Sequence, residues 1–312
     1  MIDRVAGNQD GKGVALVLGA GGARGLAHVG VIEELQARGY RIEAVVGCSI
    51  GALIGGVYCA GRLPEYKKWA CSLTRREVFR LVDFAFGHPG FIKGDRVINA
   101  LKGLVGEHLI ENLSIPYKAV ATDLDTRQQV WISNGPLFDA IRASIAIPML
   151  LTPHHYLGHD LVDGGLLAPV PVDGAREFEG LRIIAVDINA KNSDVLGIDA
   201  ISGLAPVLPE QQETNLTAIQ QGWSRLLQSI GKSRPVTPKV RANRSLMDLM
   251  SRSLSTMQGF MTEVQMQRSP PDLMINVAHD SCTIYEFWRA QEMIELGRQS
   301  AARALDQSEA GI

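Results

Sequence analysis

The sequence predicts an α/β fold, because short apolar runs typical of buried strands alternate along the chain with longer segments of helical periodicity. Two early strands run into glycine-containing turns that lead straight into helices. The expected strands span residues 13–19, 42–47, 117–124, 128–133, 156–163, 181–188 and 272–277. The expected helices span residues 25–39, 50–61, 64–73, 94–105, 136–146, 172–178, 211–231, 244–265 and 284–306.

Composition and charge exclude several functional classes. A chain of 312 residues, 46% hydrophobic, has ample material for a core, and its net charge of −2 argues against a nucleic-acid partner. The cysteines show no C-x-x-C spacing, so free thiols are expected, and the histidines at 154, 155 and 159 suit a polar hairpin better than a metal site. No apolar run approaches the ~20 residues of a membrane span, and residues 1–10 lack the apolar centre of a signal peptide. We therefore expect a cytoplasmic protein, with peripheral contact at the inner membrane face as the alternative.

The pentapeptide Gly47-Cys48-Ser49-Ile50-Gly51 lies between a predicted strand and a predicted helix. A serine at such a turn is typical of a nucleophile elbow, where the backbone is strained and neighbouring Cβ atoms would collide. Gly47 and Gly51 remove those Cβ atoms. The pentapeptide alone is a weak signal, but its position between a buried strand and a helix of small residues favours Ser49 as a nucleophile.

A glycine-rich loop, Gly19-Ala20-Gly21-Gly22-Ala23-Arg24-Gly25, follows the first predicted strand. A dinucleotide fingerprint is the rival interpretation, but Arg24 stands where its last glycine belongs and no acidic residue ends the second strand. The N–H groups of Gly21 and Gly22 instead lie at the positive end of the following helix, where they suit an oxyanion. Arg24 adds a charge that either steadies the loop or attracts a phosphate-bearing substrate.

Asp163 opens the turn Asp163-Gly164-Gly165 after a short apolar strand. Asp-Gly-Gly is also a favoured turn with no chemical role. An α/β-hydrolase would activate Ser49 with a histidine, for which His279 is the candidate, but that fold places its elbow after about five strands rather than after the second. The residues alone leave both groups open as the base.

These loops, in this order, resemble the motifs of the patatin-like phospholipases, and within that family the bacterial relatives of neuropathy target esterase. The resemblance is carried by Gly19–Gly25, Gly47–Gly51 and Asp163–Gly165, with similar flanking sequence at 26–35 and 143–148. Ala20 replaces a usual glycine and Cys48 a usual threonine, and neither change removes a catalytic group. By motif the resemblance covers residues 14–176, and more loosely the rest.

The resemblance implies a three-layer α/β/α fold with a mainly parallel central sheet, in which residues 14–176 form the catalytic core and 177–312 the remainder of the same domain. It implies a serine esterase that hydrolyses acyl esters of phospholipids or lysophospholipids through an acyl-enzyme intermediate, without cofactor or metal. The implied roles are Ser49 as nucleophile, Asp163 as proton acceptor without histidine, and Gly21 and Gly22 as oxyanion donors supported by Arg24. An acyltransferase with the same elbow and a non-catalytic regulatory protein that retains the fold are the alternatives.

Two stretches look like additions to the sheet. Residues 71–92 bring four phenylalanines together, either as the wall or lid of an acyl pocket or as a second small core. Residues 190–268 carry apolar side chains at helical spacing, which either pack against the domain or contact a lipid surface. Acyl-chain and head-group preference, positional selectivity and oligomeric state depend on pocket shape and partners, so the motifs leave them open.

Overall fold

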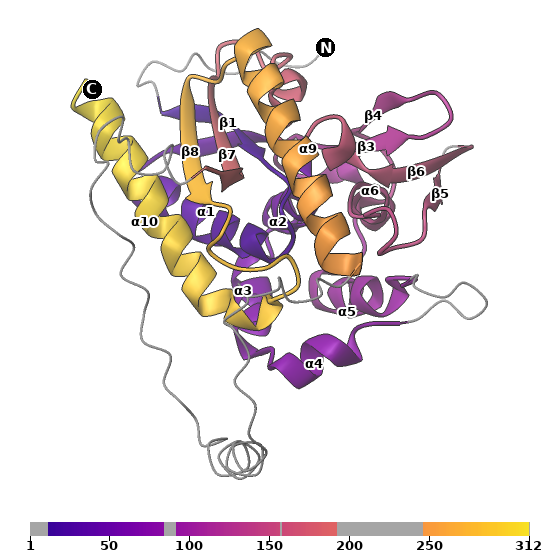
Figure 1. Cartoon of the computed structure of the whole chain (residues 1–312). Coiled ribbons are helices and arrows are strands. Elements are labelled where there is room, and N and C mark those ends of the chain that lie inside the picture. The colour runs from indigo at the N-terminus through magenta and orange to yellow at the C-terminus, as the bar shows by residue number, and fades with distance from the viewer. Residues whose placement is uncertain (1–11, 84–91, 157, 192–245, 312) are drawn as a thin grey trace, which may run out of the picture. The chain divides into compact units, whose positions relative to one another are not determined.

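The computed structural model describes residues 12–83, 92–156, 158–191 and 246–311 (Figure 1). The chain divides into two compact units, one made of residues 1–197 with 250–312 and the other of residues 198–249. Almost all of the second unit lies outside the described residues, as does the predicted helix 211–231. The fold of the first unit is the one that positions the candidate site.

The sheet of the first unit is mostly parallel, as the sequence predicts. In the described residues its strands are β1 (Gly13–Leu18), β2 (Arg41–Cys48), β3 (Tyr117–Asp123), β4 (Gln128–Ile132), β5 (His154–Tyr156), β6 (His159–Asp163), β7 (Arg182–Ala190) and β8 (Leu273–Ala278). The spatial order is β5-β6-β3-β2-β1-β7-β8, with β4 also paired to β3. The pairs among β3, β2, β1, β7 and β8 are parallel, whereas β4, β5 and β6 are joined by antiparallel pairs.

Helices cover both faces of the sheet, and alternate residues of β1 show why. Leu16 and Leu18 pack with the helices of one face. Val17 lies in a separate core with the 3-10 helix η4 (Val172–Ala175) and with Met266 of helix α9 (Leu246–Arg268). A strand buried on both faces is apolar throughout, as β1 is. The described α-helices are α1 (Ala27–Ala37), α2 (Ile50–Cys59), α3 (Leu63–Ser72), α4 (Arg75–Arg80), α5 (Asp95–Val105), α6 (Leu137–Ser144), α9 (Leu246–Arg268) and α10 (Ala290–Glu309). None of these helices is both long and apolar enough to cross a bilayer.

Several predicted elements differ from the structure. The single strand expected over 156–163 is the hairpin of β5 and β6, and Gly158 between them has a φ of +81° that a strand does not contain. The helix expected over 172–178 is the short 3-10 helix η4. The helix expected from residue 284 begins at Ala290, after the 3-10 helix η5 (Phe287–Arg289). Helix α4 was not expected, although Thr74 and Glu77 form the capping box that starts it.

The first and last helices of the unit, α1 and α10, cross at two glycines. A Cβ on Gly30 would lie 1.8 Å from the carbonyl oxygen of Ile294, and a Cβ on Gly297 would lie 2.0 Å from that of Ala27. The helix backbones therefore touch, and α10 closes over the helix that follows the glycine-rich loop.

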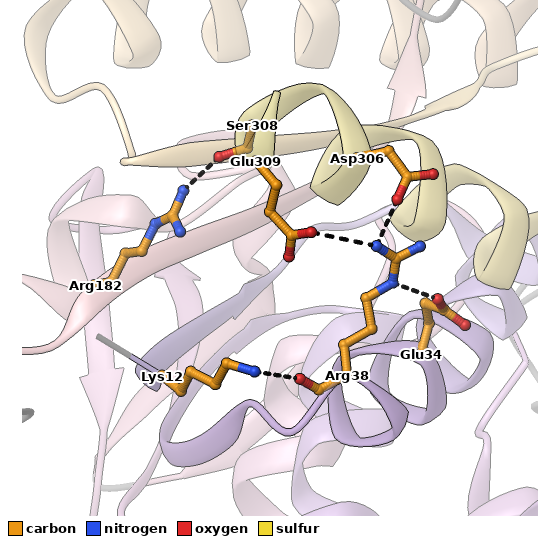
Figure 2. Close-up of polar contacts among 7 residues, drawn as sticks. All are labelled: Lys12, Glu34, Arg38, Arg182, Asp306, Ser308 and Glu309. Atoms are coloured by element: carbon orange, nitrogen blue, oxygen red, sulfur yellow. Dashed lines mark hydrogen bonds and ion pairs between the residues drawn. The ribbon is translucent and has the colours of Figure 1, made fainter. Parts of the chain in front are cut away.

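Polar contacts fasten the far end of this crossing (Figure 2). The Arg38 guanidinium, just after α1, donates to Glu34 at 2.8 Å and to Asp306 of α10 at 2.5 Å. Lys12 donates to the Arg38 carbonyl at 2.8 Å, and Arg182 of β7 donates to Ser308 of α10 at 2.8 Å. Because these groups are only partly buried and solvent screens such pairs, each contact adds little to stability.

Gly30→Ala should destabilise the protein, because the new methyl group meets backbone that cannot move without separating α1 from α10. We expect the free energy of unfolding to fall by about 1–3 kcal/mol, measured by denaturant titration. Gly103→Ala on the exposed side of α5 is the matched control, since nothing lies within 4 Å of its Cβ position. It should stabilise the protein by about 0.5–1 kcal/mol. Equal effects of the two changes would show that the helices do not cross at Gly30.

Candidate active site

Ser49 sits at the sharp turn between β2 and α2. Its backbone has φ 54° and ψ −124°, a conformation that non-glycine residues rarely adopt. A Cβ on Gly47 would lie 2.5 Å from the nitrogen of Ala52, and a Cβ on Gly51 would lie 2.1 Å from the carbonyl oxygen of Leu18. The two glycines of the pentapeptide are therefore required by packing. The turn has the geometry of a nucleophile elbow.

Ser144, the last residue of α6, holds this turn through a hydrogen bond. The Ser49 N–H donates to Ser144 Oγ at 2.8 Å, and the Ser144 hydroxyl donates to the carbonyl of Val120 in β3 at 2.6 Å. Ser144 ends α6 and is completely buried. The sequence pattern predicted no role for Ser144. The available signal was a hydroxyl inside the apolar run 143–147.

The strand order brings Asp163 to the elbow. Cys48 at the end of β2 pairs with Val120 of β3, and Ala121 of β3 pairs with Asp163 at the end of β6. The Ser49 hydroxyl donates a hydrogen bond to Asp163 Oδ2. The Gly165 N–H donates to Asp163 Oδ1 at 2.7 Å, so the turn itself orients the carboxyl group.

Both side chains of this pair are sealed from solvent, each with an exposed fraction of 3%. Burial raises the pKa of Asp163 to about 6, while the hydrogen bonds from Ser49 and Gly165 act in the opposite direction. Burial, with the charge of Asp163 nearby, also raises the pKa of the Cys48 thiol, whose Sγ is 4.0 Å from Asp163 Oδ1. Asp163 is thus a carboxylate at neutral pH with more basicity than a solvated one, and Cys48 is a neutral neighbour.

The glycine-rich loop lies beside the elbow. A Cβ on Gly25 would lie 2.2 Å from Ile50 Cγ2, and Gly22, with φ +61°, faces the carbonyl of Ile284, which accepts from the Ala23 N–H at 2.9 Å. Within the described residues, the N–H groups of Gly21 and Gly22 have no hydrogen-bond acceptor. Two unpaired donors next to a serine hydroxyl are what an oxyanion requires.

Arg24 is buried beneath this loop, with an exposed fraction of 5%. Its guanidinium donates to the carbonyl of His279 and to Asn189 Oδ1, both at 2.6 Å. The Asn189 amide in turn donates to the carbonyl of Ala20 at 2.6 Å. Of the two roles expected for Arg24, these contacts favour steadying the loop over attracting substrate. Asn189, at the end of the predicted strand 181–188, was missed because its partners are remote in sequence.

The described histidines contact groups other than the Ser49 hydroxyl. His28 is buried, its Nε2 lies 2.8 Å from the carbonyl of Gly19, and burial lowers its pKa to about 4. His279 Nδ1 lies 3.3 Å from the carbonyl of Ala190. The histidine cluster predicted to lie on a hairpin occupies β5 and β6, and His159 Nδ1 lies 2.9 Å from Asp123. The described part of the chain contains no group of three or more residues arranged to hold a metal ion.

Helix α9 lies over the Asp163 turn. The amide of Gln258 is 2.5 Å from where a Cβ of Gly165 would be, and Gln265 Nε2 donates to the carbonyl of Leu167 at 3.3 Å. Its opposite side exposes Met257 and Phe260. The side of this helix that packs here carries Gln258 and Gln265, whereas Met257, one of the apolar side chains expected to pack, is exposed. Residues 192–245 of the same stretch lie outside the described residues.

The chain is similar in sequence to several known proteins. Residues 16–176 match the family model described as patatin-like phospholipase. A Mycobacterium tuberculosis protein named as an uncharacterized NTE family protein is 34% identical over 97% of this chain and 94% of its own length. The patatin-like phospholipase domain-containing protein 6 of Homo sapiens is 32% identical over 64% of this chain and 15% of its own length. The neuropathy target esterase sws of Drosophila melanogaster is 31% identical over 58% of this chain and 13% of its own length.

Ser144→Ala should impair the elbow, because it leaves the buried Ser49 N–H and Val120 carbonyl without their partner. We expect a loss of about 1–3 kcal/mol in unfolding free energy. We also expect at least a tenfold slower reaction with a fluorophosphonate probe, since small misplacements of a nucleophile are costly. Ser72→Ala, an exposed serine bonded to the carbonyl of Trp69, is the control and should change neither. If Ser144→Ala reacted with the probe at the wild-type rate, Ser144 would have no role in positioning Ser49.

Proposed function

Because the chain belongs to the patatin-like phospholipase family, we propose that it hydrolyses acyl esters of phospholipids or lysophospholipids with Ser49 as nucleophile and Asp163 as its base. The observation that carries this proposal is the hydrogen bond from the Ser49 hydroxyl to Asp163 Oδ2, between two residues that are each only 3% exposed. A strained serine with a carboxylate as its direct acceptor has a nucleophile and a proton acceptor already in contact.

The proposed reaction has two halves. Ser49 Oγ attacks the ester carbonyl carbon as its proton passes to Asp163 Oδ2, and the carbonyl oxygen becomes an oxyanion held by the N–H groups of Gly21 and Gly22. The tetrahedral intermediate collapses, the alcohol leaves with the proton from Asp163, and the acyl group stays on Ser49. Water then attacks the acyl-enzyme, giving its proton to Asp163, and collapse releases the fatty acid while that proton returns to Ser49 Oγ.

A carboxylate is a weak base for a hydroxyl, so the proposal depends on how the site compensates. Burial raises the pKa of Asp163 to about 6, which brings it closer to a working range near neutrality. Ser49 caps the N-terminus of α2, where the helix dipole favours developing negative charge. The donors of the glycine-rich loop stabilise the oxyanion, an effect commonly worth about two to three powers of ten in rate.

The two alternatives differ in their products. An acyltransferase would pass the acyl group from Ser49 to an acceptor other than water, so free fatty acid would not accumulate. A regulatory protein would show no turnover and no labelling by a fluorophosphonate. Incubation with a defined lysophospholipid, with fatty acid measured against acyl transfer, separates these possibilities. We expect free fatty acid in stoichiometric amount with the released alcohol.

Asp163→Asn should lower ester hydrolysis by about 10²–10⁴-fold, because an amide keeps the shape but cannot accept the serine proton. Ser49→Ala, which lacks the proposed nucleophile, gives the background rate of ester hydrolysis. His279→Ala is the informative comparison and should stay near wild type, since its backbone carbonyl, not its ring, holds Arg24. Circular dichroism and the unfolding midpoint verify that each variant is folded. An active Asp163→Asn together with an inactive His279→Ala would establish a histidine base instead.

The pH profile follows from the same group. Asp163 works as a carboxylate, and its pKa is raised to about 6, so kcat/KM should be level above that pH and fall tenfold per unit below it. A histidine base has an ordinary pKa near 6.5, so the midpoint alone separates the two poorly. Carboxyl ionisation has a small enthalpy and imidazolium ionisation a large one. A midpoint that stays fixed between cold and warm assays supports Asp163, and one that moves down on warming contradicts it.

A further inference from the structure

A basic and aromatic surface adjoins the glycine-rich loop. The 3-10 helix η5 contacts both α4 and η1 (Gly22–Leu26), which begins with Gly22, one of the two proposed oxyanion donors. Ile284, three residues before η5, lies directly against Gly22. Phe79 of α4 stacks on Trp288 of η5, with ring centroids 6.4 Å apart. The outer side of α4 and η5 is therefore a wall next to the catalytic loops.

This wall combines exposed rings with positive charge. Phe79 and Tyr285 have exposed fractions of 61% and 55%. Arg75 lies over both aromatic rings of the stack, 5.9 Å from the Phe79 centroid and 5.2 Å from that of Trp288. Within the described residues, no hydrogen bond or ion pair engages the side chains of Arg76 and Arg80. We call the set Arg75, Arg76, Phe79, Arg80, Tyr285 and Trp288 the α4 face.

The acidic residues nearby are occupied by other partners. Glu77 on α4 accepts from the backbone and hydroxyl of Thr74 in the capping box. Glu286 and Glu292 form ion pairs with Arg289. The carboxylate of Asp83 accepts from the first N–H groups of α5. Within α4 itself, Arg75, Arg76 and Arg80 outnumber the single carboxylate Glu77, so the helix carries a net positive charge on exposed side chains.

We propose that the α4 face docks on an anionic lipid bilayer, an inference that rests on the proposed lipid hydrolase function. Aromatic rings enter the interface between head groups and acyl chains, and arginines beside them contact the anionic head groups. Each cation near such a surface strengthens binding about fivefold. Docking here places the bilayer beside Gly22 and η5, so that an acyl ester has a short path to Ser49.

Vesicle sedimentation with the full chain tests this surface. The Ser49→Ala background prevents turnover, and the vesicles contain either phosphatidylcholine alone or phosphatidylcholine and phosphatidylglycerol in equal amounts. Arg76→Gln with Arg80→Gln should weaken binding to the anionic vesicles about 25-fold. The charge-matched control is Arg127→Gln with Arg303→Gln, exposed residues in the β3–β4 turn and on α10, and should change binding less than twofold.

A second variant isolates the aromatic part of the surface. Salt screens the arginines, so the binding that survives at high ionic strength reports the inserted rings. Phe79→Ser should remove most of that residual binding. Hydrolysis of soluble p-nitrophenyl butyrate by the same variants, with Ser49 restored, should equal wild type, because no residue of the α4 face contacts the dyad.

These measurements separate failure of docking from failure of catalysis. Absence of soluble ester hydrolysis in the wild type would overturn the proposed function without touching the sedimentation result. Equal binding to neutral and anionic vesicles, or equal losses in the α4 pair and the control pair, would overturn docking through the α4 face.

Discussion

The backbone of Ser49 has a positive φ, and the contacts around this residue hold it in that conformation. Gly47 and Gly51 give it room, and Ser144 takes up its N–H. Because β2, β3 and β6 are neighbours in the sheet, the same turn faces the end of the strand that supplies Asp163. If the backbone of Ser49 relaxed, its hydroxyl would move away from Asp163. The site therefore depends on a strained conformation that the surrounding contacts maintain.

The buried carboxyl group carries a thermodynamic cost that the rest of the fold must offset. Raising the pKa of Asp163 from 3.8 to about 6 corresponds to about 3 kcal/mol against the ionised form. Because the folded pKa lies above the unfolded one, this cost is absent below pH 3.8 and fully present above pH 6. A neutral side chain would be more stable here at neutral pH. Such a cost is expected of the base that we propose Asp163 to be.

Sequence patterns predicted the parts of this fold that local chemistry determines. The apolar runs gave β1, β2 and β3 nearly to the residue, and the motifs pointed to the strand ends that meet at Ser49 and Asp163. The turn at Gly158, which a single backbone torsion decides, was not located by the strand pattern, although the histidines around it indicated a hairpin. Ser144 and Asn189 were missed for a different reason, since each acts on backbone groups far away in the chain. The start of α4 could have been predicted from Thr74 and Glu77, whose spacing is that of a capping box.

The hydrogen bonds beneath the glycine-rich loop join residues far apart in the chain. Arg24 is bonded to Asn189, 165 positions later, and to the carbonyl of His279, 255 positions later. Such contacts form last when a protein is synthesised from its N-terminus, because the ribosome must first release the later partner. The nascent chain contains Ser49 early, but it cannot complete the bracing of its glycine-rich loop until His279 and Ile284 have emerged.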